Sequence, residues 1–559
     1  MSYPLLLKSL LERYKRPASW VDRLMIGILA LGLLLIIGLF AYLAWFLLTN
    51  RSVTYLLPAE KTIAYMELED LSLPPKLKQE TVLDLVGLSP VIKNFFGLEV
   101  KDLKSQLGEG RLGLALLDDG TPQNQLILFI RTTRRSKALK FFEGQAAADE
   151  KLTLAGDKKF PIYTFPKSQR FVFAFKGPYL FVTQKADTLQ LIQAVADKKE
   201  LSLDADYTYQ SSLENLPRKS WVRGYLNIQK LSFGAGSLLG QTVAPLKAIL
   251  NHFALTVRKE YNGFHFNTFL AIKPDYLSLK KGFSDPTRFA YHLTDYINSD
   301  NLAAYVGGAN LSAEWQNTLS TLSELNPSYG IILEGILRAQ VAKVFGDEVN
   351  LADDLYPLFE GEYALSFENL DGGQLGLRLI LKHTDKTFAE IKVKKLQSGF
   401  QLLAAQFTPK IKSFLLPDGT ETKELVADPS RLKESSAEYE GYTIDCIEIT
   451  DSPYGFCSAV TDDLVIMANH IDSVKETIDL LASVKFALSQ SQTFRKTLSN
   501  LSAVSDEVTF IDIPNALPLF KAMPVGVLAE NLLAPFEAMT WVKHYFNDGV
   551  STEGYMLLK

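Results

Sequence analysis

Two cysteines are the residues whose types and spacing most directly suggest chemistry in this chain. Cys446 lies in the strand-like segment 442–449, Cys457 lies in 455–460, and the turn-forming residues 451–454 separate the two segments. If these segments form a hairpin, the two side chains can face each other, and an oxidising compartment would permit a disulfide. The alternative is a pair of free, buried thiols that act as small apolar side chains. A redox-active role is not predicted, because the Cys-x-x-Cys spacing is missing.

The histidines give no metal-binding pattern. No two of them have the i, i+4 spacing of a metal-binding helix, and the chain has no His-Glu-x-x-His motif. We therefore predict no metal site and expect ordinary core or surface histidines, although His252 and His265 would meet if a helix packs on a strand. The six histidines are His252, His265, His292, His383, His470 and His544.

Other motifs that serve catalysis occur only in isolation. Ser278 and Lys281 have the Ser-x-x-Lys spacing without its companion motifs, and the chain has neither a Gly-x-Ser-x-Gly elbow nor a phosphate-binding loop. Adjacent carboxylates repel each other, but two of the three acidic pairs fall in predicted turns, where aspartate is common. We therefore expect no enzyme and no cofactor. The acidic pairs are Asp118-Asp119, Asp353-Asp354 and Asp462-Asp463.

Phe171, Phe173 and Phe175 alternate along a predicted strand. This period of two is typical of the buried face of a sheet, and the alternative is an apolar groove for a ligand. A large cavity beneath this face would favour a ligand carrier, whereas a filled core would favour a scaffold protein.

The uncharged run Leu24–Asn50 is long enough to cross the ~30 Å apolar core of a bilayer as one helix. Basic residues precede the run, and positive charge near a span stays cytoplasmic. We therefore expect a single-pass cell-membrane protein with residues 1–23 in the cytoplasm and the residues after Arg51 extracytoplasmic. A cleaved signal peptide is the alternative, but its apolar region would be shorter and would end in small residues.

Charge limits the partners of the part that follows this run. The chain has a formal net charge of −5, residues 1–51 contribute +4, and the remainder therefore carries −9. An acidic exterior part offers no footprint for nucleic acid and no polybasic patch for anionic lipid. The hydrophobic content of 47% is that of a folded protein rather than of a disordered stalk.

Several short phrases recur in the same order in two halves of the exterior part. Examples are Ile63-Ala64-Tyr65 with Ala303-Ala304-Tyr305, and Tyr179–Val182 with Leu464–Met467. Ordered matches whose separation grows slowly along the chain indicate a duplication with loop insertions. We predict one exterior unit at residues 56–276, a linker at 277–294, and a second unit at 295–559 with an insertion near 394–439.

Within each unit, pairs of strands precede helical stretches. Arg111–Leu117 and Gln125–Arg131 flank a turn signal, and the helical stretch Thr188–Lys198 follows Asp187, its predicted N-cap. Strands joined by short turns pair antiparallel, and helices then cover one face of the sheet. The predicted fold class is α+β, with an N-terminal transmembrane helix followed by two tandem duplicated units of antiparallel sheet covered by helices.

The opening of the exterior part resembles a known family. Leu56-Leu57-Pro58-Ala59-Glu60-Lys61-Thr62-Ile63-Ala64-Tyr65 is similar to the Leu-Pro-Ala-Asp-Thr-like phrase of an uncharacterised bacterial family, domain of unknown function 3352. Gly224-Tyr225-Leu226-Asn227 resembles a later phrase of that family, whereas Glu60-Lys61 replaces its commoner Asp-Thr. The resemblance implies a bacterial, single-pass anchored protein, and it implies no chemistry and no site residues.

These observations predict a non-enzymatic, membrane-anchored exterior binding or scaffold protein of the bacterial cell envelope. The expected partners are the membrane, through Leu24–Asn50, and an envelope protein or lipid, but not nucleic acid. The alternative function is a carrier or sequestering domain for an apolar ligand such as lipid. The crevice between the two units is the default position for a ligand.

Overall fold

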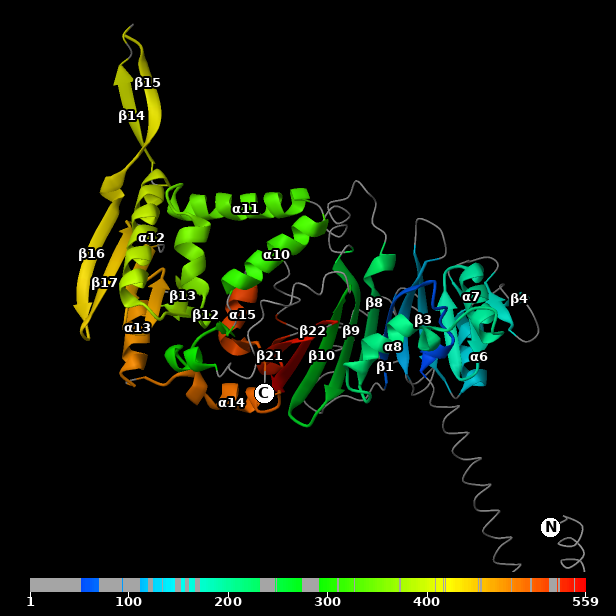
Figure 1. The fold of residues 1–559 in the computed structure, drawn as a ribbon. Helices are drawn as coiled ribbons and strands as arrows, with labels where there is room; N and C mark the ends of the chain where they lie inside the picture. Colours follow the sequence, from blue (N-terminus) through cyan, green and yellow to red (C-terminus); the bar gives the residue numbers. More distant parts are fainter. Residues whose placement is uncertain are drawn as a thin grey trace, which may run out of the picture.

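The computed structural model describes most of residues 52–559, and its larger gaps lie within 70–110, 146–151, 232–248, 274–290 and 522–532. A single antiparallel sheet of 20 strands runs through the molecule (Figure 1). The first ten strands are β1 (Thr62–Leu68), β2 (Leu112–Leu117), β3 (Gln125–Arg131), β4 (Thr153–Ala155), β5 (Ile162–Thr164), β6 (Val172–Lys176), β7 (Tyr179–Thr183), β8 (Val222–Asn227), β9 (Leu250–Lys259) and β10 (Gly263–Ile272).

The second half of the sheet contains the other ten strands. They are β11 (Ala303–Gly307), β12 (Tyr363–Leu370), β13 (Gln374–Lys382), β16 (Leu432–Tyr439), β17 (Tyr442–Ile449), β18 (Gly455–Val460), β19 (Leu464–Ala468), β20 (Glu507–Asp512), β21 (Phe536–Phe546) and β22 (Gly549–Leu558). A separate two-stranded hairpin is formed by β14 (Pro409–Leu415) and β15 (Glu421–Ala427), and it falls inside the region predicted as an insertion.

The strand order is the same when the sheet is read inward from either edge. One half runs β4-β5-β6-β7-β3-β2-β1-β8-β9-β10, and the other runs β16-β17-β18-β19-β13-β12-β11-β20-β21-β22. The two halves meet where β10 pairs with β22 from Gly263 to Ala271. Each half therefore ends on the strand that joins it to the other.

This joint corrects the predicted fold class. The prediction of two tandem units, each with its own sheet, is wrong because backbone hydrogen bonds continue across β10 and β22. The prediction of a transmembrane helix as part of the fold also finds no support: within the part of the chain that the structure describes, no helix is long and apolar enough to cross a membrane. The predicted span, Leu24–Asn50, lies outside that part.

Helices pack on both faces of the sheet. The first half carries α6 (Arg135–Gln145), α7 (Ala186–Ala196) and α8 (Tyr207–Glu214), with short turns η1 (Val53–Tyr55), η2 (Leu203–Ala205) and η3 (Ile228–Lys230). The second half carries α10 (Leu311–Leu325), α11 (Pro327–Phe345), α12 (Lys386–Phe407), α13 (Ile471–Leu481), α14 (Gln492–Leu498) and α15 (Ile513–Lys521), with turns η6 (His292–Tyr296), η7 (Leu351–Leu355), η8 (Tyr356–Phe359), η9 (Pro429–Arg431) and η10 (Leu488–Gln490).

Strand β3 shows how both faces are filled. Leu128 and Ile130 pack with Phe142 of α6, whereas Phe129 belongs to the cluster that contains Leu189 of α7. Because successive residues of a strand point to opposite faces, α6 and α7 must cover opposite sides of the sheet. The prediction that helices cover only one face is therefore wrong.

Strand β19 repeats this arrangement in the second half. Ile466 packs in the cluster that contains Val474 of α13, and its neighbour Val465 packs in the cluster that contains Leu396 of α12. The apolar run Leu464–Met467 is thus buried on both faces, as its lack of polar residues requires.

The start of α7 differs slightly from its prediction. The N-cap is Lys185, which makes no capping hydrogen bond with its side chain, and Asp187 lies in the first turn of the helix. A carboxylate in that turn still interacts favourably with the unpaired N–H groups of the helix start. Asp187 therefore supports the helix from within rather than capping it.

Aromatic rings cover three glycines along the central joint. The Phe266 ring lies against Gly554 directly across β10 and β22, the Tyr555 ring lies against Gly263, and the Phe269 ring lies against Gly549. A Cβ at Gly554 would meet the Phe266 ring, so this close packing requires glycine there. The joint is thus specified by side-chain shape as well as by backbone hydrogen bonds.

Candidate functional site

The two cysteines lie directly opposite each other on β17 and β18. Their Cα atoms are 4.0 Å apart, and the structure joins their sulfur atoms in a disulfide. Both side chains are buried in the core that α13 covers. The disulfide therefore cross-links the β17–β18 hairpin within the second half. Because both sulfur atoms are buried, a substrate cannot reach them.

The structure does not bring His252 and His265 together. His252 lies opposite Ala271, whereas His265 lies opposite Arg258, six residues further along β9. At about 3.3 Å per residue this separates them by roughly 20 Å. Among the described residues no group of three or more His, Cys, Asp or Glu side chains is placed to hold a metal ion.

His265 meets a different partner at the central joint. Its Nε2 lies 2.8 Å from Oε1 of Glu553 on β22, and His544 Nε2 lies 3.9 Å from the other oxygen of that carboxylate. Ser502 donates to the same carboxylate through its backbone N–H, at 3.0 Å. No local sequence pattern marks this cluster, because its members come from four segments that only the fold brings together: β10, β21, β22 and the segment after α14.

Two groups of ion pairs elsewhere centre on a buried side chain. Arg378, which is 1% exposed, binds Glu368 on the neighbouring strand and Glu476 on α13, whose Oε2 is 2.8 Å from its guanidinium. Asp354 likewise accepts from Lys392 at 3.0 Å and from Lys395. These charges link strands to helices, so they stabilise positions in the fold rather than face a substrate.

Among the described members of the acidic pairs, two form ion pairs with lysines. Asp354 is bound by two lysines, and Lys386 on α12 pairs with Asp462 at 2.9 Å. Ser278 and Lys281 lie outside the described residues, as does Asp119.

The phenylalanine stripe is part of the core. Phe171, Phe173 and Phe175 are all buried, and Phe173 stacks on Phe142 with ring centroids 4.2 Å apart. Tyr163 covers the other side of Phe173 at 4.9 Å. Of the two interpretations of this stripe, the buried sheet face is the one that the packing supports.

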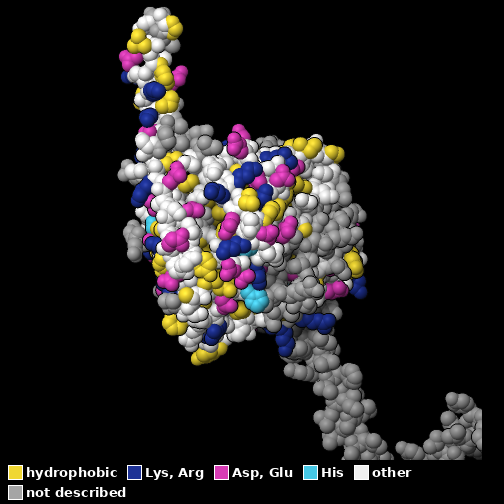
Figure 2. Space-filling view, turned by 60° about the vertical axis from the view of Figure 1, so that its left-hand side comes forward, with side chains coloured by type: hydrophobic (Ala, Val, Ile, Leu, Met, Phe, Trp, Pro, Cys, Tyr) yellow, Lys and Arg dark blue, Asp and Glu magenta, His cyan; other side chains and the backbone are white. Residues whose placement is uncertain are grey.

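The β14–β15 hairpin projects from the body of the molecule (Figure 2). Ile411 and Leu415 are 68% and 78% exposed, and they share one face of the hairpin because they lie four residues apart on a strand. On the other face, the Lys412 ammonium lies 5.1 Å from the centre of the Phe414 ring. On one face of the hairpin a lysine thus contacts an aromatic ring, and the other face presents aliphatic side chains to solvent.

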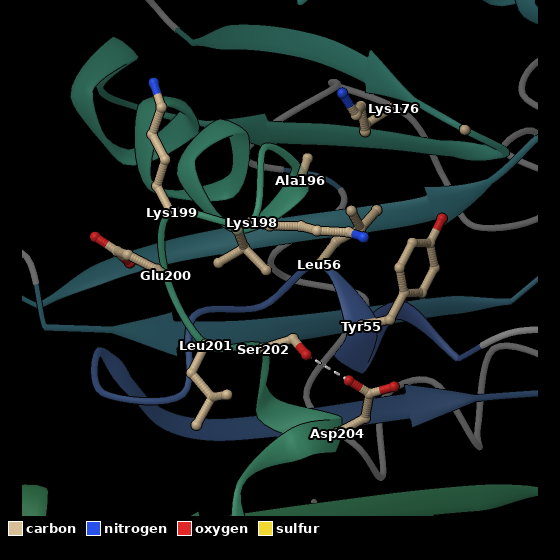
Figure 3. A pocket seen from close by; sticks show the side chains of 12 residues that line it. Tyr55, Leu56, Lys176, Ala196, Lys198, Lys199, Glu200, Leu201, Ser202 and Asp204 are labelled. Carbon is tan, nitrogen blue, oxygen red and sulfur yellow. Dashed lines mark hydrogen bonds between the residues drawn. The ribbon is translucent and has the colours of Figure 1, made fainter.

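A recess of about 640 Å³ lies in the first half, between the end of α7, the turn after β6, and η1. We call it the lysine recess, and its lining includes Tyr55, Leu56, Lys176, Lys198 and Leu201. Figure 3 shows Lys198 extending toward Tyr55 and Leu56, and Lys176 lines the recess from the end of β6. The recess thus combines two ammonium groups with apolar side chains.

Acidic and hydroxyl groups line another side of the lysine recess. Ser202 donates a hydrogen bond to Oδ1 of Asp204, at 2.7 Å, and Glu200 and Lys199 lie on the exposed rim (Figure 3). Sequence reasoning missed this site because its lysines come from two separate loops. The positive φ of Lys198 is the local feature that turns the chain out of α7 and places its side chain here.

The comparisons with known proteins now place the chain in a family. A family model described as a protein of unknown function (DUF3352) matches residues 100–407, more than half of the chain. The chain belongs to the DUF3352 family. The matched residues run from before β2 to the end of α12, so the family match spans both halves of the sheet.

The other comparisons add little. A search of curated proteins finds no relative. Crystal forms I and IV of TP0453 are among the similar solved structures, at 9% and 10% identity and TM-scores of 0.25 and 0.23. The aligned parts cover 40% and 41% of this chain and 79% and 85% of those chains. We draw nothing from a likeness this weak.

Proposed function

We propose that this DUF3352 protein is a non-enzymatic binding or scaffold protein of the bacterial cell envelope, and that a partner protein contacts the β14–β15 hairpin. The observation that carries the proposal is the exposed aliphatic face of this hairpin, outside the 20-stranded sheet. A two-stranded hairpin is at best marginally stable alone in water. A partner that covers Ile411 and Leu415 would remove this apolar surface from solvent and hold the hairpin in place.

A second apolar surface lies on the same side of the molecule as the hairpin (Figure 1). On α11, Ile331, Ile332 and Ile336 are 71%, 56% and 52% exposed. Helix α12 packs against both α11 and β15, so it links these two surfaces. Together they offer a partner a helix face and a strand pair with open edges, which suits recognition by a folded protein.

Charge favours a protein over an anionic lipid surface as the partner. Residues 409–428 contain three lysines and four acidic residues, and Lys410 is paired with Asp428 at 2.9 Å. A segment without excess positive charge gains nothing from a negatively charged membrane. The apolar contacts must therefore supply most of the binding free energy.

The disulfide supports a location outside the cytoplasm. Buried disulfides such as Cys446–Cys457 persist in oxidising compartments and are rare in the cytosol. The alternative function, a carrier for an apolar ligand such as lipid, called for a cavity beneath Phe173. That position is instead filled by the rings of Phe142 and Tyr163, which favours a scaffold.

Site-specific photo-crosslinking in cells tests the proposal. A photoreactive side chain at Leu415 should give a defined protein adduct, whereas the same group at Leu154, which is 68% exposed on edge strand β4, should not. The Ile411→Ser/Leu415→Ser variant should fold normally and lose co-purification of that same protein. Adducts that contain only lipid, or equal adducts at both positions, would contradict the proposal.

A further inference from the structure

The two halves of the sheet allow the lysine recess to be compared with its counterpart in the same chain. The isolated bridge Pro58–Ser202 in the first half corresponds to Asn298–Ala487 in the second half. The first residue of each bridge follows a short turn, η1 or η6, and the second residue comes just before another, η2 or η10. Ser202 and Ala487 are 285 positions apart, and so are the two left-handed residues Lys198 and Ser483. The ends of α7 and α13 are therefore equivalent.

The counterpart shows that the fold does not require the lysines. Ser483 adopts φ 58° where Lys198 adopts φ 59°, so a small neutral residue serves this turn equally well. Thr461 occupies the position of Lys176, since its N–H bonds to the carbonyl of Leu464 at the same place before β19. Val484 stands in the sequence where the first half has Lys199.

This comparison weakens the ordinary explanation for lysines at a helix end. A cation near the C-terminus of a helix is favoured by the helix dipole. That effect applies equally to α13, yet Ser483 and Val484 stand at the positions of the two lysines. The basic residue that follows them, Lys485, is paired with Glu476 at 3.0 Å. The basic residues of the first half therefore need a reason that is specific to the lysine recess.

We propose that the lysine recess binds the phosphate ester of a polyol, with the phosphate held between Lys176 and Lys198. Ammonium groups form charge-assisted hydrogen bonds with phosphate oxygens. None of the ion pairs among the described residues involves either ammonium group. The Lys176 ammonium lies 5.8 Å from the centre of the Phe160 ring, and this contact leaves its positive charge unneutralised. Both ammonium groups can therefore still bind an anion.

The rest of the lining fits the polyol part of such a ligand. Asp204 accepts from Ser202 through one oxygen, which leaves acceptor capacity for a ligand hydroxyl group. Glu200 lies on the same exposed side of the recess, and Leu56 and Leu201 offer apolar contacts to carbon atoms. A volume of about 640 Å³ lies within the usual range for small-molecule sites. Acids on one side and lysines on the other would orient the ligand.

This site goes beyond the proposed function, because it lies in the opposite half of the sheet from the β14–β15 hairpin (Figure 1). A phosphate ester of glycerol occurs both in soluble glycerol phosphate and in the headgroup of phosphatidylglycerol. Binding of glycerol 3-phosphate is therefore measured by calorimetry, and binding of phosphatidylglycerol vesicles by flotation. Glycerol and phosphatidylcholine vesicles are the respective controls.

The test variant is Lys176→Thr/Lys198→Ser, which introduces the residues of the second half. It should keep the melting temperature of the wild type and weaken binding of the phosphate probe at least tenfold, and added salt should weaken wild-type binding. Lys219→Ser, an exposed lysine outside the recess, should bind as the wild type does. Binding of vesicles alone would assign the site to a lipid headgroup, and binding of glycerol 3-phosphate would assign it to a soluble ester.

Two results would overturn the proposal. One is the absence of binding to both phosphate probes by the full-length chain. The other is equal binding by the wild type and the folded double variant. Because neither lysine contacts the hairpin, the Ile411→Ser/Leu415→Ser variant should still bind the phosphate probe, and its result keeps this proposal separate from the partner-protein proposal.

Discussion

His265 on β10 and Glu553 on β22 meet across the strand pairing that joins the two halves of the sheet, with Nε2 2.8 Å from Oε1. The carboxylate also accepts from the backbone N–H and the hydroxyl of Ser502, in the segment that follows α14. Glu553 therefore ties three separate segments together at the centre of the molecule.

The first prediction concerns the pH dependence of this contact. Burial raises the pKa of Glu553, but hydrogen bonds from His265 and Ser502 outweigh it and lower the pKa to about 2, from 4.5. A lowered pKa stabilises the fold above pH 4.5, and this stabilisation disappears as the pH falls toward 2. Its size is about 3 kcal/mol at most.

Glu553→Gln should therefore lower the free energy of unfolding at pH 7 by about 2 kcal/mol and flatten its dependence on pH below 4.5. Urea denaturation at pH 7 and at pH 3 measures both effects. Glu143→Gln, on the exposed side of α6, is the matched control and should change neither. An unchanged pH profile in Glu553→Gln would show that this carboxylate is not held in its charged form.

The second prediction concerns glycine at the joint. Gly554→Ala would place a Cβ against the Phe266 ring and should destabilise the protein by about 1–3 kcal/mol, since a packed interface cannot absorb the methyl group. Gly335→Ala is the control, because nothing lies within 4 Å of its Cβ position in α11 and alanine favours a helix by about 1 kcal/mol. Thermal unfolding should therefore shift in opposite directions in the two variants.

Local structure was more predictable from the sequence than the contacts between distant segments. Cys446 and Cys457 face each other because a short turn joins their two strands, which the sequence indicates. The burial of Phe173 was predictable from the alternation of phenylalanines along its strand. The pairing of β10 with β22 leaves no local pattern, because the two strands are almost 300 residues apart and either could serve as an edge.

The coverage of both faces did have a signal in the sequence. The runs Leu126–Ile130 and Leu464–Met467 are continuously apolar rather than alternating, and such runs are typical of strands that are buried on both sides. The lysine recess had no comparable signal in the sequence. Lys176 and Lys198 stand out only when they are compared with the neutral residues at the equivalent positions of the second half.

The third prediction concerns the disulfide. Replacing Cys446 and Cys457 by serine should cost about 3 kcal/mol, from the entropy that the short closed loop removes in the unfolded chain. Alkylation of the protein under denaturing conditions without reductant should modify neither sulfur, and alkylation after reduction should modify both. Two reactive thiols before reduction would contradict the bond that the structure contains.

The last prediction concerns Arg378, the largest fully buried side chain among the described residues, which binds Glu368, Glu476 and the hydroxyl of Thr477. Arg378→Met should cost about 3–5 kcal/mol at pH 7, because buried Glu368 would lose its counter-charge while Glu476 would keep only Lys485, at 3.0 Å. Burial already raises the pKa of Glu368, and the loss of the neighbouring guanidinium would raise the pKa of this carboxyl further.

A raised pKa reverses the usual trend, so the stability of Arg378→Met should increase as the pH falls from 7 toward 5, where protonation removes the unpaired charge. The triple variant Arg378→Met/Glu368→Gln/Glu476→Gln should recover part of the loss and show little dependence on pH in this window. Urea denaturation across this pH range compares the two variants. If the single and triple variants are equally destabilised at pH 7, lost packing rather than unpaired charge accounts for the role of Arg378.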